Sequence, residues 1–262
     1  MAATSLRRLI GRFGLWLPLA VVLIIGALPP LTGSATLREG IFLLLMFAAL
    51  ASSLNILLGY TGYVSFGHIV FFGLGGYVGF WCLSALDWPL PLAVLAGGLA
   101  AALLALAIGL SVLRLRGAYF ALATIGINEA MRAFVSNFGP FGGPTGMSLD
   151  FSVYQAYGGA GNALWLTYFA VLGLTLLVVA ASYAVKTSKF GLGLLSIRED
   201  EDAAMVMGVR TPRAKALALV MSAIVPGMIG VLFLNNNGLA MIIFCIKNLV
   251  FSLCVVLNHM RC

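Results

Sequence analysis

Five long stretches without a single charged residue constrain the fold of this 262-residue chain more than any other feature of its sequence. They are residues 13–37, 40–86, 88–113, 151–185 and 216–246. About 20 helical residues, at a rise of about 1.5 Å each, cover the roughly 30 Å hydrocarbon core of a bilayer. Each stretch can therefore cross a membrane as a helix. Only 9% of the residues are charged, against about a quarter in soluble domains, so we predict an integral membrane protein.

Eight transmembrane helices are predicted when Gly, Pro and charge clusters are taken as the boundaries of apolar runs. They span residues 13–31, 41–58, 69–86, 89–113, 117–136, 164–185, 214–234 and 239–257. The expected fold is an all-α, polytopic membrane helical bundle that forms a single domain over residues 1–262. The basic start, with Arg7, Arg8 and Arg12, is also typical of a cleaved secretory signal. The apolar run that follows is longer than in such signals, which favours a retained first helix.

The basic residues indicate how the helices are oriented. With a cytoplasmic N-terminus, alternation places the turn at 114–116, the segment 186–213 and the C-terminus inside the cell. All fifteen Lys and Arg residues except Arg38, Arg132 and Lys247 then lie inside, as the positive-inside rule requires. The same rule accounts for the net charge of +7, so membrane lipid is an expected partner and nucleic acid is not.

Several kinds of catalytic site have no counterpart in the sequence. It contains no G-x-x-x-x-G-K-[ST] motif, so the chain is not expected to be an enzyme that hydrolyses ATP, and an ATP-driven step would need another subunit. The four cysteines form no C-x-x-C pair, and two histidines are few for an intramembrane enzyme. No cofactor and no metal are therefore expected in this chain.

The segment "LNILLGYTGYVSFGHIVFFGLGGYVGF" joins two apolar runs through closely spaced glycines. The simpler interpretation is a turn followed by packing glycines, because a pair such as Gly75-x-x-x-Gly79 lets helices approach closely. The alternative is non-helical backbone at membrane depth that meets a transported solute. Candidate pathway residues in this segment are Asn55, Gly59, Ser65, Gly67 and His68. A Ser65–His68 hydrolase pair has no third member, and "GYVSFG" lacks the first glycine of a G-x-S-x-G elbow.

Glu129 and Arg132 are the two charges within the predicted helix 117–136. Glu129 would lie about 18 Å along this helix from its inner end. An ionisable residue at that depth is a candidate pathway residue by default. The alternative, which we favour, is an i,i+3 ion pair that keeps either charge from standing alone. Both roles are compatible.

The segment "SIREDEDAAMVMGV" (196–209) holds four of the eight acidic residues of the chain. Ser196 and Glu199 have the spacing of a capping box, which predicts a helix that starts at Ile197 and stops at the following glycine. The acids would then lie near the positive end of the helix dipole. The apolar residues from Ala203 on have to be buried against the bundle or a partner, unless the segment is simply a charged loop in solvent.

Four stretches resemble the branched-chain amino acid ABC importer permeases of the LivM type. They read "LNILLGYTGYVSFGHIVFFGLGGY", "RLRGAYFALATIGINEAMR", "GGPTGM" and "SKFGLGLLSIREDEDAAMVMGVRTPRAKALALVMSAI". Together they cover about residues 50–233, and their order and spacing make the resemblance specific. It implies a permease that forms half of a translocation pathway and imports Leu, Ile or Val. By the residues alone, urea, amides and other amino acids stay open as solutes.

The resemblance also implies partners at the bacterial inner membrane. They are a homologous second permease subunit, two cytoplasmic ATPase subunits that use ATP and Mg, and a periplasmic substrate-binding protein. Long connections at 137–163, outside, and 186–213, inside, suit one partner on each face, although long loops can also be merely tolerated. The 189–208 region would be the coupling segment that sits in an ATPase groove. Its expected contact residues are Glu199, Asp200, Glu201, Ala203, Ala204, Met207 and Gly208.

Two further expectations follow. The alternative function is a secondary transporter or channel for a small polar solute such as urea or an amide, and only Glu129 and the glycine segment suit its ion coupling. Residues 234–262 depart from the family pattern, which predicts a shortened or frame-shifted end.

Overall fold

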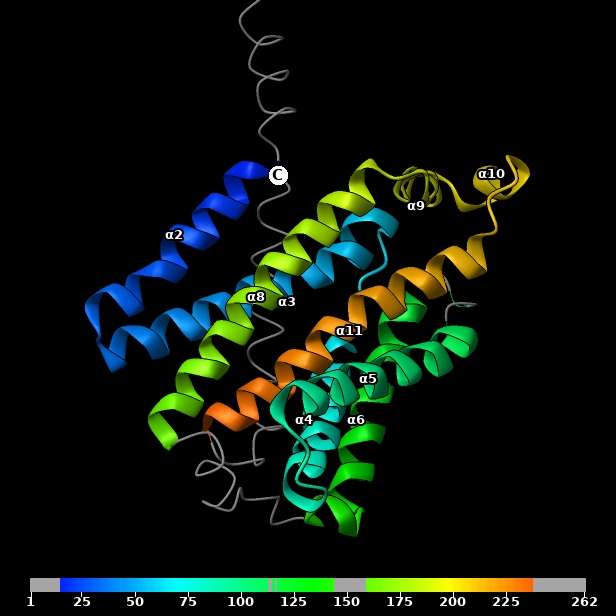
Figure 1. Cartoon of the computed structure of the whole chain (residues 1–262). Coiled ribbons are helices and arrows are strands. Elements are labelled where there is room, and N and C mark those ends of the chain that lie inside the picture. Colours follow the sequence, from blue (N-terminus) through cyan, green and yellow to red (C-terminus); the bar gives the residue numbers. More distant parts are fainter. Residues whose placement is uncertain (1–14, 113–114, 116, 144–158, 238–262) are drawn as a thin grey trace, which may run out of the picture.

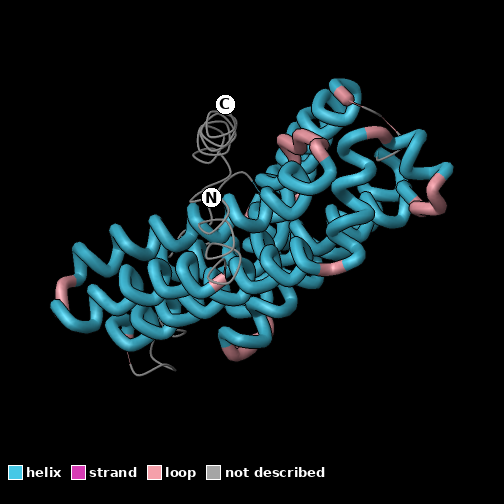
Figure 2. The backbone as a smooth tube through the Cα atoms, turned by 90° about the horizontal axis from the view of Figure 1, so that it is seen from above, coloured by secondary structure: helices cyan, strands magenta, loops and turns pink. Residues whose placement is uncertain are grey.

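The structure, a computed structural model, describes residues 15–112, 115, 117–143 and 159–237, and its regular structure there is entirely helical (Figure 1). The helices are α2 (Trp16–Thr32), α3 (Ala35–Thr61), α4 (His68–Ala85), α5 (Leu90–Val112), α6 (Ala118–Asn137), the 3₁₀-helix η1 (Gly139–Phe141), α8 (Ala160–Thr187), α9 (Lys189–Glu199), α10 (Glu201–Val206) and α11 (Thr211–Asn237). Mostly short loops join them (Figure 2). The all-α prediction is confirmed.

Seven of the eight predicted spans coincide with a helix of the structure. Five helices are long and apolar enough to cross a membrane, namely α3, α4, α5, α8 and α11, and α2 is a shorter apolar helix. α6 does not qualify by composition, in keeping with the charges of Glu129 and Arg132 along it. The eighth span, 239–257, lies outside the described residues, as do Arg7, Arg8 and Arg12 and most of the 137–163 connection. The count of eight therefore stays a prediction.

The turn between α2 and α3 explains why α3 begins well before the predicted residue 41. Gly33, with φ of 65°, ends α2, and the hydroxyl of Ser34 accepts the N–H of Leu37 at 3.4 Å to cap α3. This early start carries Arg38 into the helix, where it is only 7% exposed and lies 5.4 Å from the ring centroid of Trp165. The predicted start of α3 after Arg38 is therefore wrong, because the ring of Trp165 covers the guanidinium group and lets it lie within the helix.

α11 lies between the two halves of the bundle, against α4 and α5 on one side and α3 and α8 on the other (Figure 1). Glycines make the close approach possible. A Cβ on Gly97 of α5 would lie 2.6 Å from the carbonyl oxygen of Gly75 on α4, and a Cβ on Gly75 would overlap the backbone of Gly227 on α11. A Cβ on Gly79 would overlap the side chain of Val231 on α11. The predicted packing role of the Gly75-x-x-x-Gly79 pair is confirmed.

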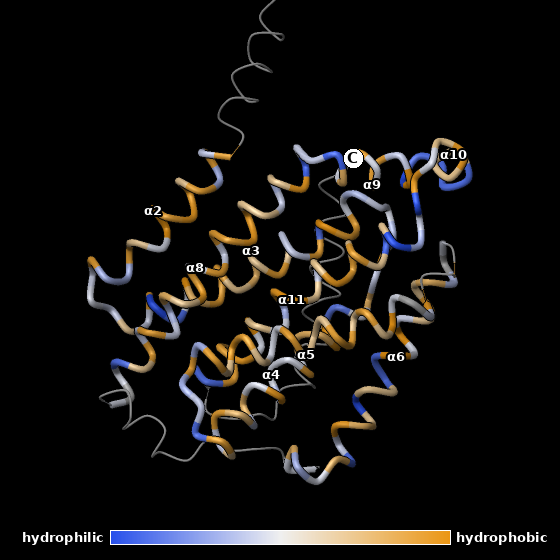
Figure 3. Tube along the Cα trace, turned by 45° about the vertical axis from the view of Figure 1, so that its right-hand side comes forward, coloured by the Kyte–Doolittle hydropathy of each residue, from blue (hydrophilic) through white to orange (hydrophobic). Residues whose placement is uncertain are grey.

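The connection between α3 and α4 and the segment between α8 and α11 meet at one end of the bundle, beside the start of α6. The ring of Tyr63 stands edge-on to Phe120 with 5.3 Å between centroids, and its hydroxyl bonds to Glu201. Polar residues gather around α9, α10 and the start of α11, while the long helices are mostly apolar (Figure 3). The alternation used to predict topology therefore holds for these connections.

Candidate coupling segment and translocation residues

Two helices, not one, form the segment between α8 and α11. α9 begins at Lys189, where the hydroxyl of Ser188 accepts the N–H of Gly191 at 3.1 Å. The prediction of a helix start at Ile197 is wrong, because Ser196 already lies inside α9 and donates its hydroxyl to the Gly193 carbonyl at 2.8 Å. Inside a continuous helix the following backbone N–H groups bond to carbonyls one turn back, so they have no need of a cap at this position.

Asp200 divides the acidic run. Its extended backbone separates α9 from α10, and its Oδ1 accepts the N–H groups of Asp202 at 2.9 Å and Ala203 at 3.1 Å. Glu201 and Asp202 therefore occupy the first turn of α10, where the helix dipole favours acids. Glu199, the remaining acid of the run, is the last residue of α9. Gly208 has φ of 89° and donates to the Met205 carbonyl just after α10, so the predicted stop is confirmed.

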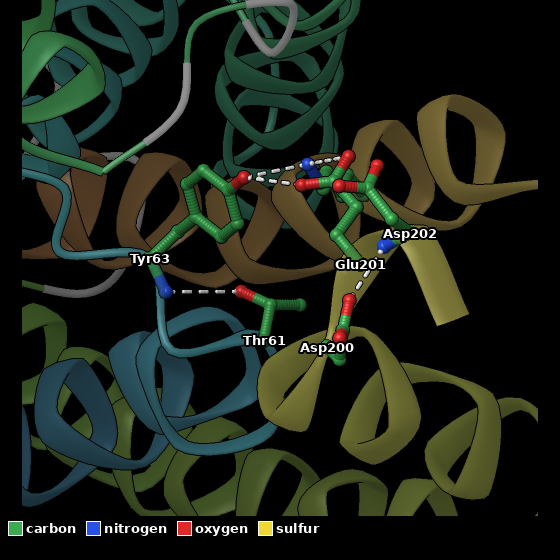
Figure 4. Close-up of polar contacts among 6 residues, drawn as sticks. Thr61, Tyr63, Asp200, Glu201 and Asp202 are labelled. Carbon is green, nitrogen blue, oxygen red and sulfur yellow. Dashed lines mark hydrogen bonds and ion pairs between the residues drawn. The ribbon is translucent and has the colours of Figure 1, made fainter. Parts of the chain in front are cut away.

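A polar triad of Tyr63, Glu201 and Lys215 ties α10 to the membrane helices (Figure 4). The Lys215 Nζ lies 2.6 Å from Glu201 Oε1 and donates to the Tyr63 hydroxyl at 2.7 Å. That hydroxyl donates in turn to Glu201 Oε2 at 2.8 Å. Lys215 is 1% exposed, and a cation so deeply buried needs a charged partner and hydrogen bonds to be stable.

α9 and α10 are also packed onto the bundle by apolar and backbone contacts. Ala204 is buried in one cluster with Leu57 of α3 and Leu219 of α11. Arg198 donates from Nη1 to the carbonyl oxygen of Gly59, at 3.2 Å, near the end of α3. α9 and α10, the candidate coupling segment, are therefore packed directly against the ends of the helices that they are expected to move.

The predicted contact residues divide into an inward group and an exposed outward group, the latter being Glu199, Asp200, Ala203, Met207 and Gly208. Val206 and Asp202, which were not predicted, lie among the exposed residues. Glu201 and Ala204 face the bundle, as described above. The side chains of Val206 and Met207 are 87% and 84% exposed, more than the other large apolar side chains in the described part of the chain. Asp202 and Ala203 are exposed beside them. We call Val206 and Met207 the apolar tip of α10.

Asn55 and Gly59, two of the predicted pathway residues, line one open cavity of about 590 Å³ between α2, α3 and α8. Lys186, near the end of α8, is the charged residue in its wall, and Ser182 and Tyr183 add polar groups. The cavity is large enough for a small amino acid. Its mixed lining is compatible with a zwitterion that carries an apolar side chain.

Ser65, Gly67 and His68 form a second group, buried between α3, α6 and α11. The hydroxyl of Ser65 accepts the N–H of Gly67 at 3.3 Å. The Nε2 of His68 lies 3.1 Å from the hydroxyl of Ser222 on α11, and Ser53 of α3 bonds to the carbonyl of Ser222. These bonds join three helices, and they give no support to a hydrolase pair because the imidazole meets Ser222 instead of Ser65.

Glu129 and Arg132 form the predicted i,i+3 ion pair, with 3.4 Å between Oε2 and Nη1. Both side chains are nearly half exposed on the outer face of α6. This pair lies on α6, whereas Asn55 and Gly59 lie on α3 and the group around His68 lies at the start of α4, so the seven candidate pathway residues occupy three places. Sequence reasoning missed Lys215 and Ser222; the one available signal for Lys215 was its place as the last cation before the uncharged stretch 216–246.

Comparison with known proteins identifies the family. A model described as the permease component of the branched-chain amino acid transport system matches residues 36–257. The LivM permease protein of the high-affinity branched-chain amino acid transport system of Escherichia coli is 31% identical over 229 residues, covering 75% of this chain and 52% of that protein. Its counterpart from Salmonella typhimurium is 30% identical over 227 residues, covering 74% and 51%.

The chain spans about half the length of these curated relatives. No solved structure matches it. The family model covers most of the sequence, including the four stretches whose resemblance was noted above. The chain therefore belongs to the family of branched-chain amino acid transport system permease components.

Proposed function

We propose that this chain is a membrane-spanning permease subunit of an ATP-driven importer of branched-chain amino acids in the bacterial inner membrane, with a cytoplasmic N-terminus. It would form half of the translocation pathway beside a homologous second permease subunit. Separate ATPase subunits would bind and hydrolyse ATP with Mg, and a periplasmic protein would deliver the amino acid. The names of the family and of its relatives support the substrate class.

The apolar tip of α10 is the observation that carries this proposal. Val206 is 87% and Met207 is 84% exposed, and α10 lies at the end of the bundle where polar residues gather (Figure 3). Exposed apolar side chains on a helix that is otherwise anchored mark a protein contact. A shallow groove on a cytoplasmic ATPase would bury both side chains, and the acids of the segment would orient the helix at its rim.

The exposed face of α6 supports a second permease subunit. Its Glu129–Arg132 pair lies on a helix with apolar neighbours such as Leu122 and Phe134 exposed on the same element. Charges in contact with lipid are costly, so such residues usually face protein or water. A partner subunit on this face would cover the apolar residues and leave the ion pair beside a shared pathway.

The test is co-purification with the candidate ATPase subunits in detergent. A Val206→Ser/Met207→Ser double variant should bind the ATPase at least about tenfold more weakly, because burial of such side chains contributes about 1.5–3 kcal/mol each. Leu86→Ser, which removes a half-exposed apolar side chain from the turn after α4, is the matched control and should bind normally. Reversal of Glu199, the exposed last residue of α9, tests the acids outside the polar triad.

Two results would contradict the proposal. Equal binding by the tip variant and the control would remove α10 as the docking element. Uptake of leucine that persists after ATP depletion, with no ATPase bound to the wild type, would instead favour the alternative of a secondary transporter or channel.

A further inference from the structure

The polar triad joins α10 to three parts of the transmembrane bundle at a single point. Glu201 is the first residue of α10, and Lys215 lies near the start of α11. Tyr63 lies in the connection between α3 and α4, and its ring packs edge-on against Phe120 of α6. A displacement of Glu201 therefore acts at once on α11, on the α3–α4 connection and on α6.

The geometry of the triad is closed and short. Each carboxylate oxygen of Glu201 has one of the two partners, and those partners are bonded to each other, with all three distances between 2.6 and 2.8 Å. Contacts that involve charged groups are stronger than neutral hydrogen bonds. With Lys215 1% exposed and the Glu201 side chain 17% exposed, water and salt screen them little.

The rest of α10 is attached weakly by comparison. Of its six residues, Ala204 is buried, Glu201 is half-buried, and Asp202, Ala203, Met205 and Val206 are exposed. The helix ends in the left-handed Gly208. Besides the chain that continues into α11, Glu201 and Ala204 are two points at which a force applied to the exposed tip reaches the bundle. Of these two, only Glu201 makes directional, charged contacts that can pull as well as push.

We propose that Tyr63 and Lys215 are positioning residues for transport, which act through Glu201 to convert a movement of α10 into a movement of α11 and the α3–α4 connection. This inference rests on the proposed function and deepens it, because it names the residues that couple ATP hydrolysis in the partner to the membrane pathway. Removal of the triad leaves the docking tip intact, so it uncouples hydrolysis from transport without dissociating the ATPase.

The experiment uses the complete transporter in proteoliposomes and measures leucine transported per ATP hydrolysed. Lys215→Met removes the contacts with both Glu201 and Tyr63. It should lower this ratio at least about tenfold, the effect of even one lost hydrogen bond to a charged group, while the ATPase stays bound. Tyr63→Phe keeps the ring against Phe120 and removes only the hydroxyl, so it should cause a smaller loss. Arg213→Met, the same change at an exposed cation of α11, is the matched control and should leave the ratio unchanged.

Charge exchange separates positioning from folding. Glu201→Lys/Lys215→Glu restores an ion pair between α10 and α11, and its ratio should exceed that of Lys215→Met. Wild-type ratios in both Tyr63→Phe and Lys215→Met, with ATP-dependent uptake intact, would overturn the role of the triad and leave the proposed function standing. Absence of ATP-dependent uptake in the wild-type transporter would overturn the proposed function itself, and the role of the triad with it.

Discussion

Asp200 decides the local structure of the acidic segment. Its carboxylate accepts two N–H groups of α10, two of the four that a helix start leaves without a partner. The six-residue helix is too short to be stable through its own backbone bonds. Its order therefore depends on this cap, on Ala204 and on the polar triad.

Replacement of Asp200 tests the cap. Asp200→Ala should destabilise α10 by about 1 kcal/mol, the usual cost of a lost N-cap, and hydrogen exchange of amides 202–206 should speed up accordingly. Asp200→Asn keeps a capping oxygen and loses the charge, so it should exchange at nearly the wild-type rate. Equal acceleration in both variants would show that the charge, and not the cap, orders the helix.

At single positions, local features such as a helix end or a close ion pair could be predicted from the sequence, whereas long-range contact partners could not. Gly208 ends α10 as expected, and the Glu129–Arg132 spacing correctly predicted an ion pair. The partners of Lys215 could not be predicted, because Tyr63 and Glu201 lie 152 and 14 positions away in the sequence and meet it only after α3, α9 and α11 have packed. Long-range contacts of this kind follow from tertiary structure, which local spacing does not determine.

Among the elements, the contact of α4, α5 and α11 depends on glycine. Without side chains at Gly75, Gly97 and Gly227, the three backbones approach closely enough for carbonyl groups to touch the neighbouring helix. Lipid is as apolar as the side chains of membrane helices, so burial of apolar surface does not drive these helices together. Their association depends on such close packing instead. Added volume at this contact must therefore push whole helices apart.

Gly75→Ala should destabilise the bundle by about 1–3 kcal/mol, the typical effect of overpacking, and should lower the midpoint of thermal unfolding in detergent. Gly173→Ala is the matched control on α8. A Cβ at Gly173 meets open space, and alanine favours a helix by up to about 1 kcal/mol over glycine, so the midpoint should stay or rise. If Gly75→Ala and the control had equal midpoints of thermal unfolding, the helices could move apart at this contact without a loss of stability.

The helices themselves were predictable because their long apolar runs have few other ways to fold in a membrane. The errors fall where charge was used as a boundary. Arg38 lies inside α3 because an aromatic ring covers it, and the acidic run contains a break at Asp200 instead of a helix start at Ile197. α6 is not among the five helices that are long and apolar enough to cross a membrane, so this predicted span stays a prediction.

On the scale of the whole molecule, the candidate residues for coupling and those for the pathway lie in different places. The candidate coupling segment lies at one end of the bundle, where it is bonded to α3, to α11 and to the connection between α3 and α4. The pathway candidates fall into three places, namely the cavity at Asn55, the buried group around His68 and the outer face of α6. The role of all three in transport stays a prediction, and in the proposed transporter a second permease subunit would have to bring the outer face of α6 into a shared pathway.

The orientation of the bundle gives the last prediction. Among the described residues, the end that carries α9 and α10 holds Lys186, Lys189, Arg198, Arg210, Arg213 and Lys215, whereas Arg38 and Arg132 belong to helix parts nearer the other end. Basic residues are retained on the cytoplasmic side during insertion. The apolar tip should therefore be cytoplasmic, and the turn between α4 and α5 should be periplasmic.

Single cysteines at both ends test this orientation, in a chain whose own Cys82, Cys245, Cys254 and Cys262 are replaced by alanine. A membrane-impermeant maleimide should label Leu86→Cys in intact spheroplasts, because Leu86 is 45% exposed in the turn after α4. It should label Met207→Cys only after the membrane is permeabilised, since a polar reagent does not cross the hydrocarbon core. The reverse pattern would place α10 outside the cell, where no ATP-hydrolysing partner could reach its apolar tip, and would refute both the orientation and the proposed docking.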